Sequence, residues 1–439
     1  MTFPASVPSI VHNRIRRFDD SHTIERYVAE GGYEALRKAL TSMTPEQVHE
    51  EVKTSNLTGR GGAGFPAGNK WGLLPPDVFP RYVVVNGDES EPGTFKDREL
   101  MERDPHQLVE GALICAYAVR ATRVFLYVRG EMALAQERVG QALVDAYARN
   151  FVGNDIMGTG WSMDVVLHWG AGAYIVGEET ALIESLEGKR AFPRIKPPFF
   201  PAAKGLYYKP TIVNNVETLS NLPWIVTNGG AAFAAMGGGR STGTRIESLS
   251  GHVKRPGNYE IEQHNTTFRD LIFDPALGAG MRSDVPLKMF IPGGASAPWL
   301  FPEHLDTKID GDEAAKLGTM LGSGAVVVMD ESTCSVRAAW NIVHFFAHES
   351  CGQCTPCREG TTWLERILWR IETGSGREED LDLLLDVSDN ISVGLGWPPK
   401  QTTICPLGPS AASPILSSVP HFRDEYLVHV KEGGCPHGR

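Results

Sequence analysis

The sequence has no excess of positive charge and no uninterrupted apolar run. Its 42 lysine and arginine residues stand against 53 aspartate and glutamate residues, which gives a formal net charge of −11 at pH 7. An acidic surface repels the phosphate backbone, so nucleic-acid binding is not expected. The longest apolar stretch, residues 111–128, contains Arg120 and Arg123. A membrane-spanning helix needs roughly 20 consecutive apolar residues, so this stretch is not expected to cross a bilayer.

No secretory signal is expected either, because no apolar segment follows the basic residues near the N-terminus. We therefore expect a soluble, intracellular protein that reaches a membrane only through a complex. Its 42% of hydrophobic and 22% of charged residues are typical of a globular protein that buries a core. At roughly 150 residues per domain, its 439 residues predict about two to four domains.

Cysteines are few, and their pattern favours metal or redox chemistry. The seven cysteines are odd in number and unevenly spaced, which argues against a disulfide framework. Three of them form the segment Cys351-x-x-Cys354-x-x-Cys357, a spacing that can wrap one face of an iron–sulfur cubane. Cys405 is the best candidate for a fourth ligand, because a proline follows it as in ferredoxin ligand runs. Zinc stays open as an alternative, although no second Cys-x-x-Cys pair exists.

Other potential ligands have weaker signals. Cys115 lies in an apolar helix and is predicted to be a buried small hydrophobe. Cys334, at the start of a helix near the cysteine-rich segment, is a weaker ligand candidate, and Cys435 has no predicted role. His344 and His348 are four residues apart on a helix, but the glutamate of His-Glu-x-x-His is missing, so they are predicted to be packing or surface residues.

Two glycine-rich segments are candidate nucleotide-binding loops. Residues 59–64 match G-x-G-x-x-G, but a helix precedes them and Phe65-Pro66 follows. This context disfavours an ordinary Rossmann fingerprint and favours a loop that lets a nucleotide or ring approach the backbone. Residues 170–180 follow a strand and open a helix, whose free N–H groups favour a phosphate. Alternatively, Glu178 and Glu179 only complement the helix dipole there.

Two common catalytic motifs are missing. The chain has neither a Walker A loop nor a G-x-S-x-G sequence, so phosphate-loop hydrolysis and serine hydrolysis are unsupported. Cluster ligands together with glycine-lined loops instead suggest electron transfer from a nucleotide cofactor. A hydride donor gives two electrons and a cluster accepts one, so a flavin is expected between them.

The order of predicted elements indicates a mostly parallel α/β fold up to about residue 240. Its predicted strands are 81–85, 124–128 and 164–168, and its predicted helices include 45–54, 105–120, 131–149 and 178–187. Strands at 245–250, 258–262, 287–291 and 325–329, with a helix at 267–273, predict a small β-grasp-like module. Residues from about 332 onward are predicted to be helical, and the stripe Leu364, Ile367, Leu368 and Ile371 marks one buried helix face. The predicted domains are therefore a leading helical segment plus a Rossmann-like domain (1–240), the β-grasp-like module (241–331) and a helical bundle carrying the cluster (332–439).

Five segments together carry a family resemblance. Residues 59–71, 86–93, 170–182, 214–219 and 349–360 are similar to the NADH-binding flavoprotein subunit of respiratory complex I, and the resemblance extends over residues 25–430. It implies FMN, one [4Fe–4S] cluster and NADH as the electron donor. It also implies a thioredoxin-like [2Fe–2S] subunit and a large iron–sulfur subunit as partners, at the cytoplasmic side of the bacterial inner membrane.

The resemblance implies roles for individual residues. Those implied to line FMN are Gly61, Gly62, Lys70, Asn86, Asp88, Ser90, Tyr174, Gly177, Asn214, Asn215 and Thr218, with Lys70 and the last helix start near its phosphate. Phe65 and Phe199 are implied to contact the adenine of NADH, and Lys196 its phosphates. Glu91 and Glu179 are implied at the nicotinamide-ribose side as the candidate catalytic residues, which supply position and electrostatics and not a general acid. Those implied to hold the cluster are Cys351, Cys354, Cys357 and Cys405.

Some features depart from the family pattern or bear on its alternatives. Leu73 stands where some members have a second adenine-stacking aromatic residue, and the stretch 392–403 before Cys405 is longer than usual. The diaphorase subunits of NAD-linked hydrogenases and formate dehydrogenases share this core but often carry fused ferredoxin-like domains. A non-catalytic scaffold that only docks subunits is the alternative from another class. The acids Asp88, Glu89 and Glu91, with no arginine in their turn, favour NADH over NADPH.

Overall fold

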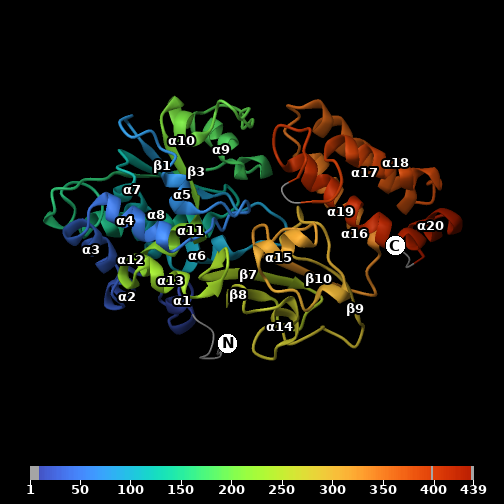
Figure 1. Ribbon diagram of the computed structural model, residues 1–439, viewed down its shortest axis with the longest axis horizontal. Coiled ribbons are helices and arrows are strands. Elements are labelled where there is room, and N and C mark those ends of the chain that lie inside the picture. The colour runs from blue at the N-terminus through green and yellow to red at the C-terminus, as the bar shows by residue number, and fades with distance from the viewer. Residues whose placement is uncertain (1–8, 397–398, 437–439) are drawn as a thin grey trace. The chain divides into compact units, whose positions relative to one another are not determined.

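The computed structural model describes residues 9–396 and 399–436 (Figure 1). The described chain forms two compact units. Unit 1 comprises residues 9–90, 95–247 and 258–266, and unit 2 comprises residues 91–94, 248–257 and 267–436. The division into domains at 240 and 331 stays a prediction.

Unit 1 is built on a parallel sheet. Its strands are β1 (Tyr82–Gly87), β2 (Arg123–Val128), β3 (Val165–Trp169) and β4 (Thr211–Asn215), in the order β3-β2-β1-β4. β1 pairs in parallel with β2 and with β4, and β2 pairs in parallel with β3. This confirms the predicted parallel α/β fold.

The strand order reverses beside β1, since β2 and β3 lie on one side of it and β4 on the other. Asn86 of β1 is directly opposite Asn215 of β4, so the carboxyl ends of these two strands meet. In open α/β sheets a ligand binds outside the carboxyl ends of the strands at such a switch point. The sheet therefore marks one edge of unit 1 as the place to look for a nucleotide site.

Helices cover this sheet on both sides (Figure 1), which explains why Val83, Val84 and Val85 are all buried although successive side chains face opposite ways. Thr44 caps α4 with a capping box and a proline follows it, so this helix has the predicted bounds. The helices of unit 1 are α1 (Asn13–Arg17), α2 (Ile24–Ala29), α3 (Glu34–Ser42), α4 (Pro45–Thr54), α5 (Ala67–Trp71), α6 (Lys96–Arg103), α7 (Pro105–Ala118), α8 (Ala133–Ala148), α9 (Glu179–Leu186), α10 (Pro201–Lys204), α11 (Val216–Ser220), α12 (Leu222–Asn228) and α13 (Gly230–Ala234).

A second sheet is mixed. Its strands are β7 (Thr244–Gly251), β8 (Gly257–Glu262), β9 (Leu287–Ile291) and β10 (Ala325–Asp330), in the order β8-β7-β10-β9. β10 pairs in parallel with β7 and antiparallel with β9. A two-stranded ladder of β5 (Gly237–Gly238) and β6 (Ser241–Thr242) precedes it, and the helices α14 (Phe268–Phe273) and α15 (Gly311–Lys316) belong to unit 2. These strands and α14 confirm the predicted elements of this region.

The last part of unit 2 is helical. It contains α16 (Ser335–Glu349), α17 (Thr355–Glu372), α18 (Glu379–Ile391), α19 (Leu407–His421) and α20 (Arg423–Glu432). The predicted apolar stripe of α17 is buried and shares one core with residues of α16, α18 and α19. Within residues 9–396 and 399–436, no helix is long and apolar enough to cross a membrane.

Candidate functional site

The glycine loop of unit 1 is tied to the first turn of α11. The backbone N–H of Arg60 donates to Thr218 Oγ1 over 2.9 Å. A Cβ on Gly61 would lie 3.0 Å from Asn215 Cβ, so only glycine fits there without moving its neighbour. The Asn215 side chain in turn caps α11 by accepting the N–H groups of Glu217 and Thr218. The structure thus brings together four predicted site residues: Gly61, Gly62, Asn215 and Thr218.

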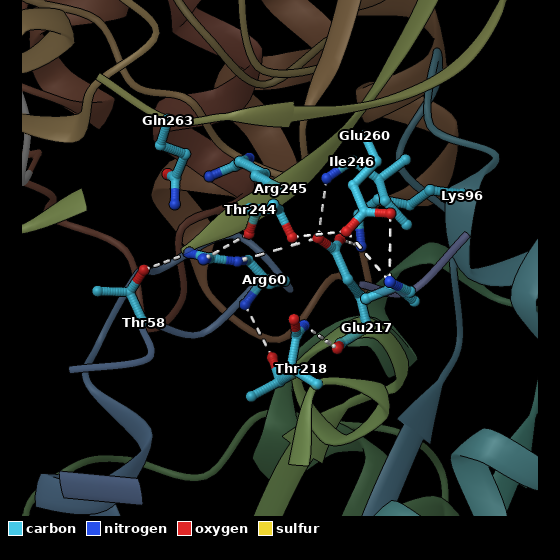
Figure 2. Close-up of polar contacts among 12 residues, drawn as sticks. Thr58, Arg60, Lys96, Glu217, Thr218, Thr244, Arg245, Ile246, Glu260 and Gln263 are labelled. Carbon is cyan, nitrogen blue, oxygen red and sulfur yellow. Dashed lines mark hydrogen bonds and ion pairs between the residues drawn. The ribbon is translucent and has the colours of Figure 1, made fainter. Parts of the chain in front are cut away.

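A buried network of charged side chains fixes this arrangement (Figure 2). The Arg60 guanidinium is fully buried and donates to the carbonyl oxygens of Thr242 and Thr244 over 3.0 and 2.8 Å. Its Nε lies 3.9 Å from Glu217 Oε1, and Lys96 Nζ lies 2.8 Å from Glu217 Oε2. The Glu217 carboxylate therefore interacts with two cations, and each of them compensates for its burial.

The network continues behind Asn215. Asp97 accepts hydrogen bonds from Lys96 over 2.9 Å and from Asn215 Nδ2 over 2.6 Å. Glu89 accepts the backbone N–H groups of Asp97 and Arg98. Burial raises the pKa of Glu89, and the neighbouring Asp97 carboxylate raises it further. The Asn215 cap is therefore held from two sides, by α11 and by Asp97.

Glu260 closes unit 1 at its N-terminal end. Its carboxylate accepts the backbone N–H groups of Ile10, Val11 and His12 and the hydroxyl of Thr244. Glu260 is fully buried and lies in the same close-up as Arg60 (Figure 2). One carboxylate therefore fixes both the start of the described chain and the strand that accepts from Arg60.

The turn before α9 lies over the end of β1. Asn86 Nδ2 donates to the Gly177 carbonyl over 2.9 Å, and the Ser90 hydroxyl donates to the Tyr174 carbonyl over 3.3 Å. A Cβ on Gly177 would lie 3.6 Å from both Asp88 O and Ser90 Oγ. The structure therefore places these five predicted residues on one small surface at the carboxyl end of β1.

Two lysines and two glutamates form an ion-pair chain in the same unit. Lys70 Nζ lies 2.8 Å from Glu179 Oε2. Lys196 Nζ lies 2.8 Å from Glu178 Oε1 and 3.4 Å from Glu179 Oε1. Burial opposes ionisation of Glu179, but the two lysines outweigh it and hold its pKa below the usual value. Lys70, Lys196 and Glu179 are thus adjacent although they are far apart in sequence.

The sequence offers two interpretations of the helix start at residues 178–180: free N–H groups that favour a phosphate, or acids that only complement the helix dipole. A 3₁₀ turn, Tyr174–Gly177, intervenes, and the Glu178 carboxylate accepts the N–H groups of Thr180 and Ala181. A carboxylate already occupies the start of α9, as the dipole-complementing alternative proposed.

The residues implied for NADH lie in different surroundings. Phe65 and Leu73 are exposed by 51% and 61%, and Phe199 is half-buried with its ring 6.4 Å from that of Tyr208. Glu91 belongs to unit 2, where its Oε1 accepts the Ser296 N–H over 2.6 Å. Glu179 belongs to unit 1, so the two predicted acids are held by different units.

The cysteine-rich segment lies between α16 and α17. Cys354 precedes the first residue of α17, Cys357 lies in its first turn, and Cys351 lies in the connection to α16. Burial raises the pKa of the Cys357 thiol to about 11, with further upward contributions from Cys354 and Cys351, whereas its contact with Ser350 lowers it. Iron of a bound cluster would offset this cost, because iron stabilises thiolates.

Two glycines pack closely near the cysteines predicted as ligands in α17 and before α19. Gly360 follows Cys357 by three residues, and Gly408 follows Cys405 by three. A Cβ on either glycine would lie within 3 Å of a side-chain atom of Ile391. The first turns of α17 and α19 therefore meet at Ile391, which places Cys357 and Cys405 in the same part of unit 2.

The long stretch before Cys405 is described in part. Residues 397 and 398 lie outside the described residues. On either side of them Ser392 bridges to Gln401, and the Val393 N–H donates to the Lys400 carbonyl over 3.2 Å. The flanks of this stretch thus form a narrow antiparallel loop that leads to Cys405.

The weaker candidates have ordinary surroundings. Cys115 is fully buried, as predicted, and Asn214 Nδ2 lies 3.7 Å from its sulfur. His344 stacks on Trp340 and lies 2.8 Å from Glu365, and His348 is a surface residue. The packing and surface interpretation of the two histidines is confirmed.

Comparison with known proteins agrees with this geometry. A family model described as the Nuo51 FMN-binding domain matches residues 52–224, and one described as the NADH-ubiquinone oxidoreductase-F iron-sulfur binding region matches residues 337–429. The chain is 50% identical over 431 residues to the NADH-quinone oxidoreductase F subunit of Mycobacterium tuberculosis, covering 96% of this chain and 94% of that protein. It is 48% identical to the F subunit of Streptomyces coelicolor over 419 residues, covering 95% and 90%.

The chain belongs to the F-subunit family of the NADH-quinone oxidoreductases.

A solved structure is similar as well. It is that of an NAD+-reducing [NiFe]-hydrogenase in the H2-reduced state, with a TM-score of 0.80, 31% identity, and coverage of 97% of this chain and 67% of that chain. In the present chain, the segment matched by the FMN-binding model contains the glycine loop, β1–β4 and α11. The segment matched by the iron–sulfur model contains all four predicted cluster cysteines.

Sequence reasoning missed the residues that support the site. Arg60, Lys96, Asp97, Glu217 and Glu260 are fully or nearly fully buried. Charged residues are seldom buried, so composition and periodicity predict them at the surface. The one local signal was Arg60, which lies inside the glycine loop.

Proposed function

We propose that this chain is the subunit through which NADH delivers electrons to an NADH:quinone oxidoreductase of the complex I type. The observation that carries the proposal is that the FMN-matched segment contains the glycine loop tied to α11. The chemistry that FMN supplies when bound is the conversion of the electron pair of the NADH hydride into single electrons, which a [4Fe–4S] cluster takes up one at a time.

The residues at the carboxyl ends of β1 and β4 fit a flavin mononucleotide. Gly61 leaves the backbone open where a side chain would crowd Asn215, and Gly177 faces Ser90 without a side chain between them. Lys70 supplies the positive charge that a phosphate needs, and Thr218 and Ser90 supply hydroxyls. The residues proposed to hold FMN are Gly61, Gly62, Lys70, Asn86, Asp88, Ser90, Tyr174, Gly177, Asn214, Asn215 and Thr218.

Unit 1 offers several groups for NADH, and Glu91 of unit 2 is proposed to add one more. The exposed ring of Phe65 is proposed to stack on the adenine together with Phe199, and Lys196 to neutralise the phosphates. Glu179 is proposed beside the nicotinamide ribose, where the two lysines keep it ionised. Glu91 is proposed at the same side of the nucleotide, and its charge disfavours an added 2′-phosphate.

The cluster is proposed on Cys351, Cys354, Cys357 and Cys405. Four thiols with this spacing fit a [4Fe–4S] group, because the chemistry of the donor set is that of ferredoxin sites. The contribution of the chain is to position the thiols with the first turns of α17 and α19. In this proposal α16–α20 are a cluster-carrying bundle, and β7–β10 with α14 are a β-grasp-like module.

The partners are proposed from the family. A single cluster passes its electrons to another protein, and we infer a thioredoxin-like [2Fe–2S] subunit and a large iron–sulfur subunit. The site of action is the cytoplasmic side of the bacterial inner membrane, reached through these partners. The diaphorase subunit of an NAD-linked hydrogenase is the second candidate, which the fold similarity to the hydrogenase favours.

The test uses the isolated complex and rapid mixing. NADH should bleach the flavin absorbance within the turnover time of the enzyme. Lys70→Met should lower the FMN content severalfold, because the phosphate loses its counter-charge. Lys189→Met is the matched control, since Lys189 lies in the same unit and is half exposed. An NADH-treated complex with unbleached flavin would contradict the proposal. Copurification of this chain with hydrogenase subunits would favour the second candidate.

A further inference from the structure

Four side chains that the proposed function does not use converge in unit 2. They are Cys334, which precedes α16, Glu372 at the end of α17, His429 in the last turn of α20, and Cys435 beyond it. One ligand atom from each lies within 4.8 Å of the others. Cys334, Glu372 and His429 are buried, and Cys435 is half-buried. Thiols, an imidazole and a carboxylate are the ligands found around protein-bound zinc.

The spacing of these atoms fits a tetrahedral ion. Cys334 Sγ lies 3.2 Å from His429 Nε2 and 3.8 Å from Glu372 Oε2, and His429 Nε2 lies 3.6 Å from Glu372 Oε2. A zinc tetrahedron with bonds of about 2.0–2.3 Å has edges of about 3.3–3.8 Å. The three distances therefore require only small adjustments to enclose an ion.

Contacts with residues outside the group also orient its ligand atoms. His429 Nδ1 donates to the Glu425 carbonyl over 2.8 Å, which leaves the lone pair of Nε2 facing the other three side chains. The Arg337 N–H donates to Cys334 Sγ over 3.3 Å, and the Arg337 guanidinium lies 3.8 Å from Glu372 Oε1. Two thiolates and one carboxylate bring three negative charges, which a divalent ion and Arg337 together cancel.

This group is separate from the cluster cysteines. α16 and α17 pack against each other, with Cys351 and Cys354 in their connection and Cys334 and Glu372 at their opposite ends. The 15 residues of α16 span about 22 Å at 1.5 Å per residue. The four side chains therefore cannot belong to the same metal centre as Cys351.

We propose that Cys334, Glu372, His429 and Cys435 bind one structural zinc ion, which joins the start of α16 to the ends of α17 and α20. Binding converts two thiols to thiolates and releases two protons to solvent, and no electron is transferred. A disulfide between Cys334 and Cys435 is the competing outcome. It would leave the buried His429 and Glu372, with their outer hydrogen bonds, without a function.

The test is metal analysis of the untagged complex after dialysis against a chelator. We expect one zinc per chain, with two sulfur neighbours at about 2.3 Å in the zinc X-ray absorption spectrum. Absence of zinc would overturn the proposal, whether peptide mapping then found a Cys334–Cys435 disulfide or two alkylatable thiols. A zinc spectrum without sulfur neighbours would also overturn it.

Variants assign the ion to this group. Cys435→Ser and His429→Gln should each lower the retained zinc at least tenfold and leave iron and FMN per chain unchanged. Cys435 is near the end of the chain and half-buried, so its variant keeps the proposal testable if the buried His429 variant does not fold. Cys115→Ser is the matched control, since Cys115 is a buried cysteine of unit 1. Full zinc retention in Cys435→Ser would overturn the assignment.

Discussion

The glycine loop of unit 1 and the cysteine segment of unit 2 are positioned in different ways. Buried ions and helix caps hold the loop, with Arg60, Lys96 and Glu217 at their centre. Apolar packing against Ile391 and the shared helix core places the cysteines. Protein contacts alone therefore fix the glycine loop. The buried thiols Cys357 and Cys405 of the second segment need a metal to become thiolates. A change to the cysteine segment should therefore affect unit 2 and leave unit 1 intact, and a change to the buried ions of unit 1 should do the reverse.

The strongest test of this contrast removes a cluster ligand. Cys354→Ser and Cys405→Ser should each abolish the cluster signal and electron transfer to quinone, because a serine hydroxyl does not replace a thiolate. FMN content and NADH-dependent ferricyanide reduction should remain, since the glycine loop belongs to unit 1. Electron paramagnetic resonance and flavin extraction measure the two outcomes. If Cys334→Ser lost the cluster while Cys405→Ser kept it, the assignment of the fourth ligand would be wrong.

The next test removes a buried cation from unit 1. Lys96→Met leaves the Glu217 carboxylate with less compensation, and breaking a buried ion pair costs about 3–5 kcal/mol. Hydrogen exchange should rise throughout unit 1 and change little in unit 2. Lys316→Met is the control, because that lysine is exposed and solvent screens its pair with Glu313. Equal effects of the two variants would show that the network does not support the fold.

A third test concerns the choice of nucleotide. Glu91→Gln keeps the size of the side chain and its ability to accept from Ser296, but removes the charge. A carboxylate near a 2′-phosphate costs about 1–3 kcal/mol after screening, so NADPH kcat/KM should rise roughly ten- to a hundredfold relative to NADH. An unchanged ratio would leave Glu91 as a structural acid of unit 2.

The smallest expected effect is a pH dependence of unit 1. Burial lowers the pKa of His106 to about 3, so the folded protein does not bind the proton that the unfolded chain binds below about pH 6.5. Stability from this residue is present above pH 6.5 and is lost as the pH falls. Between pH 7 and 5.5 the loss is about 1 kcal/mol.

The His106→Asn variant isolates this contribution, because asparagine can keep the hydrogen bond to Tyr33. Chemical denaturation at both pH values should show a stability difference between variant and wild type that shrinks on acidification. A constant difference would mean that His106 takes up its proton over the same pH range in the folded protein as in the unfolded chain.

The sequence was sufficient wherever the signal is local. Thr44 and Pro45 predict the start of α4, the residues Leu287–Ile291 form the predicted strand, and three cysteines spaced by two residues mark the metal segment. A cap, an apolar run or a ligand spacing acts over a few residues, so composition and periodicity reveal it.

Contacts between distant residues could not be predicted in this way. Asn86 and Asn215 are adjacent only because β1 pairs with β4, and strand register depends on the whole packed sheet. The sequence left Glu178 with both a dipole-complementing and a phosphate-related interpretation, and only its capping contacts decide between them. The approach of Cys334 to His429 likewise depends on how α16 and α20 pack.

The position of Glu260 has a consequence for synthesis on the ribosome. Its carboxylate holds the N–H groups of Ile10, Val11 and His12, which leave the ribosome about 250 residues earlier. Until Glu260 emerges, a nascent chain lacks both this acceptor and the Thr244 segment that accepts from Arg60. The segment matched by the FMN-binding family model ends at residue 224. When only this much of the chain has been translated, the segment therefore cannot yet reach its final structure. The packing around the glycine loop is therefore completed only after β7 and β8 have been translated.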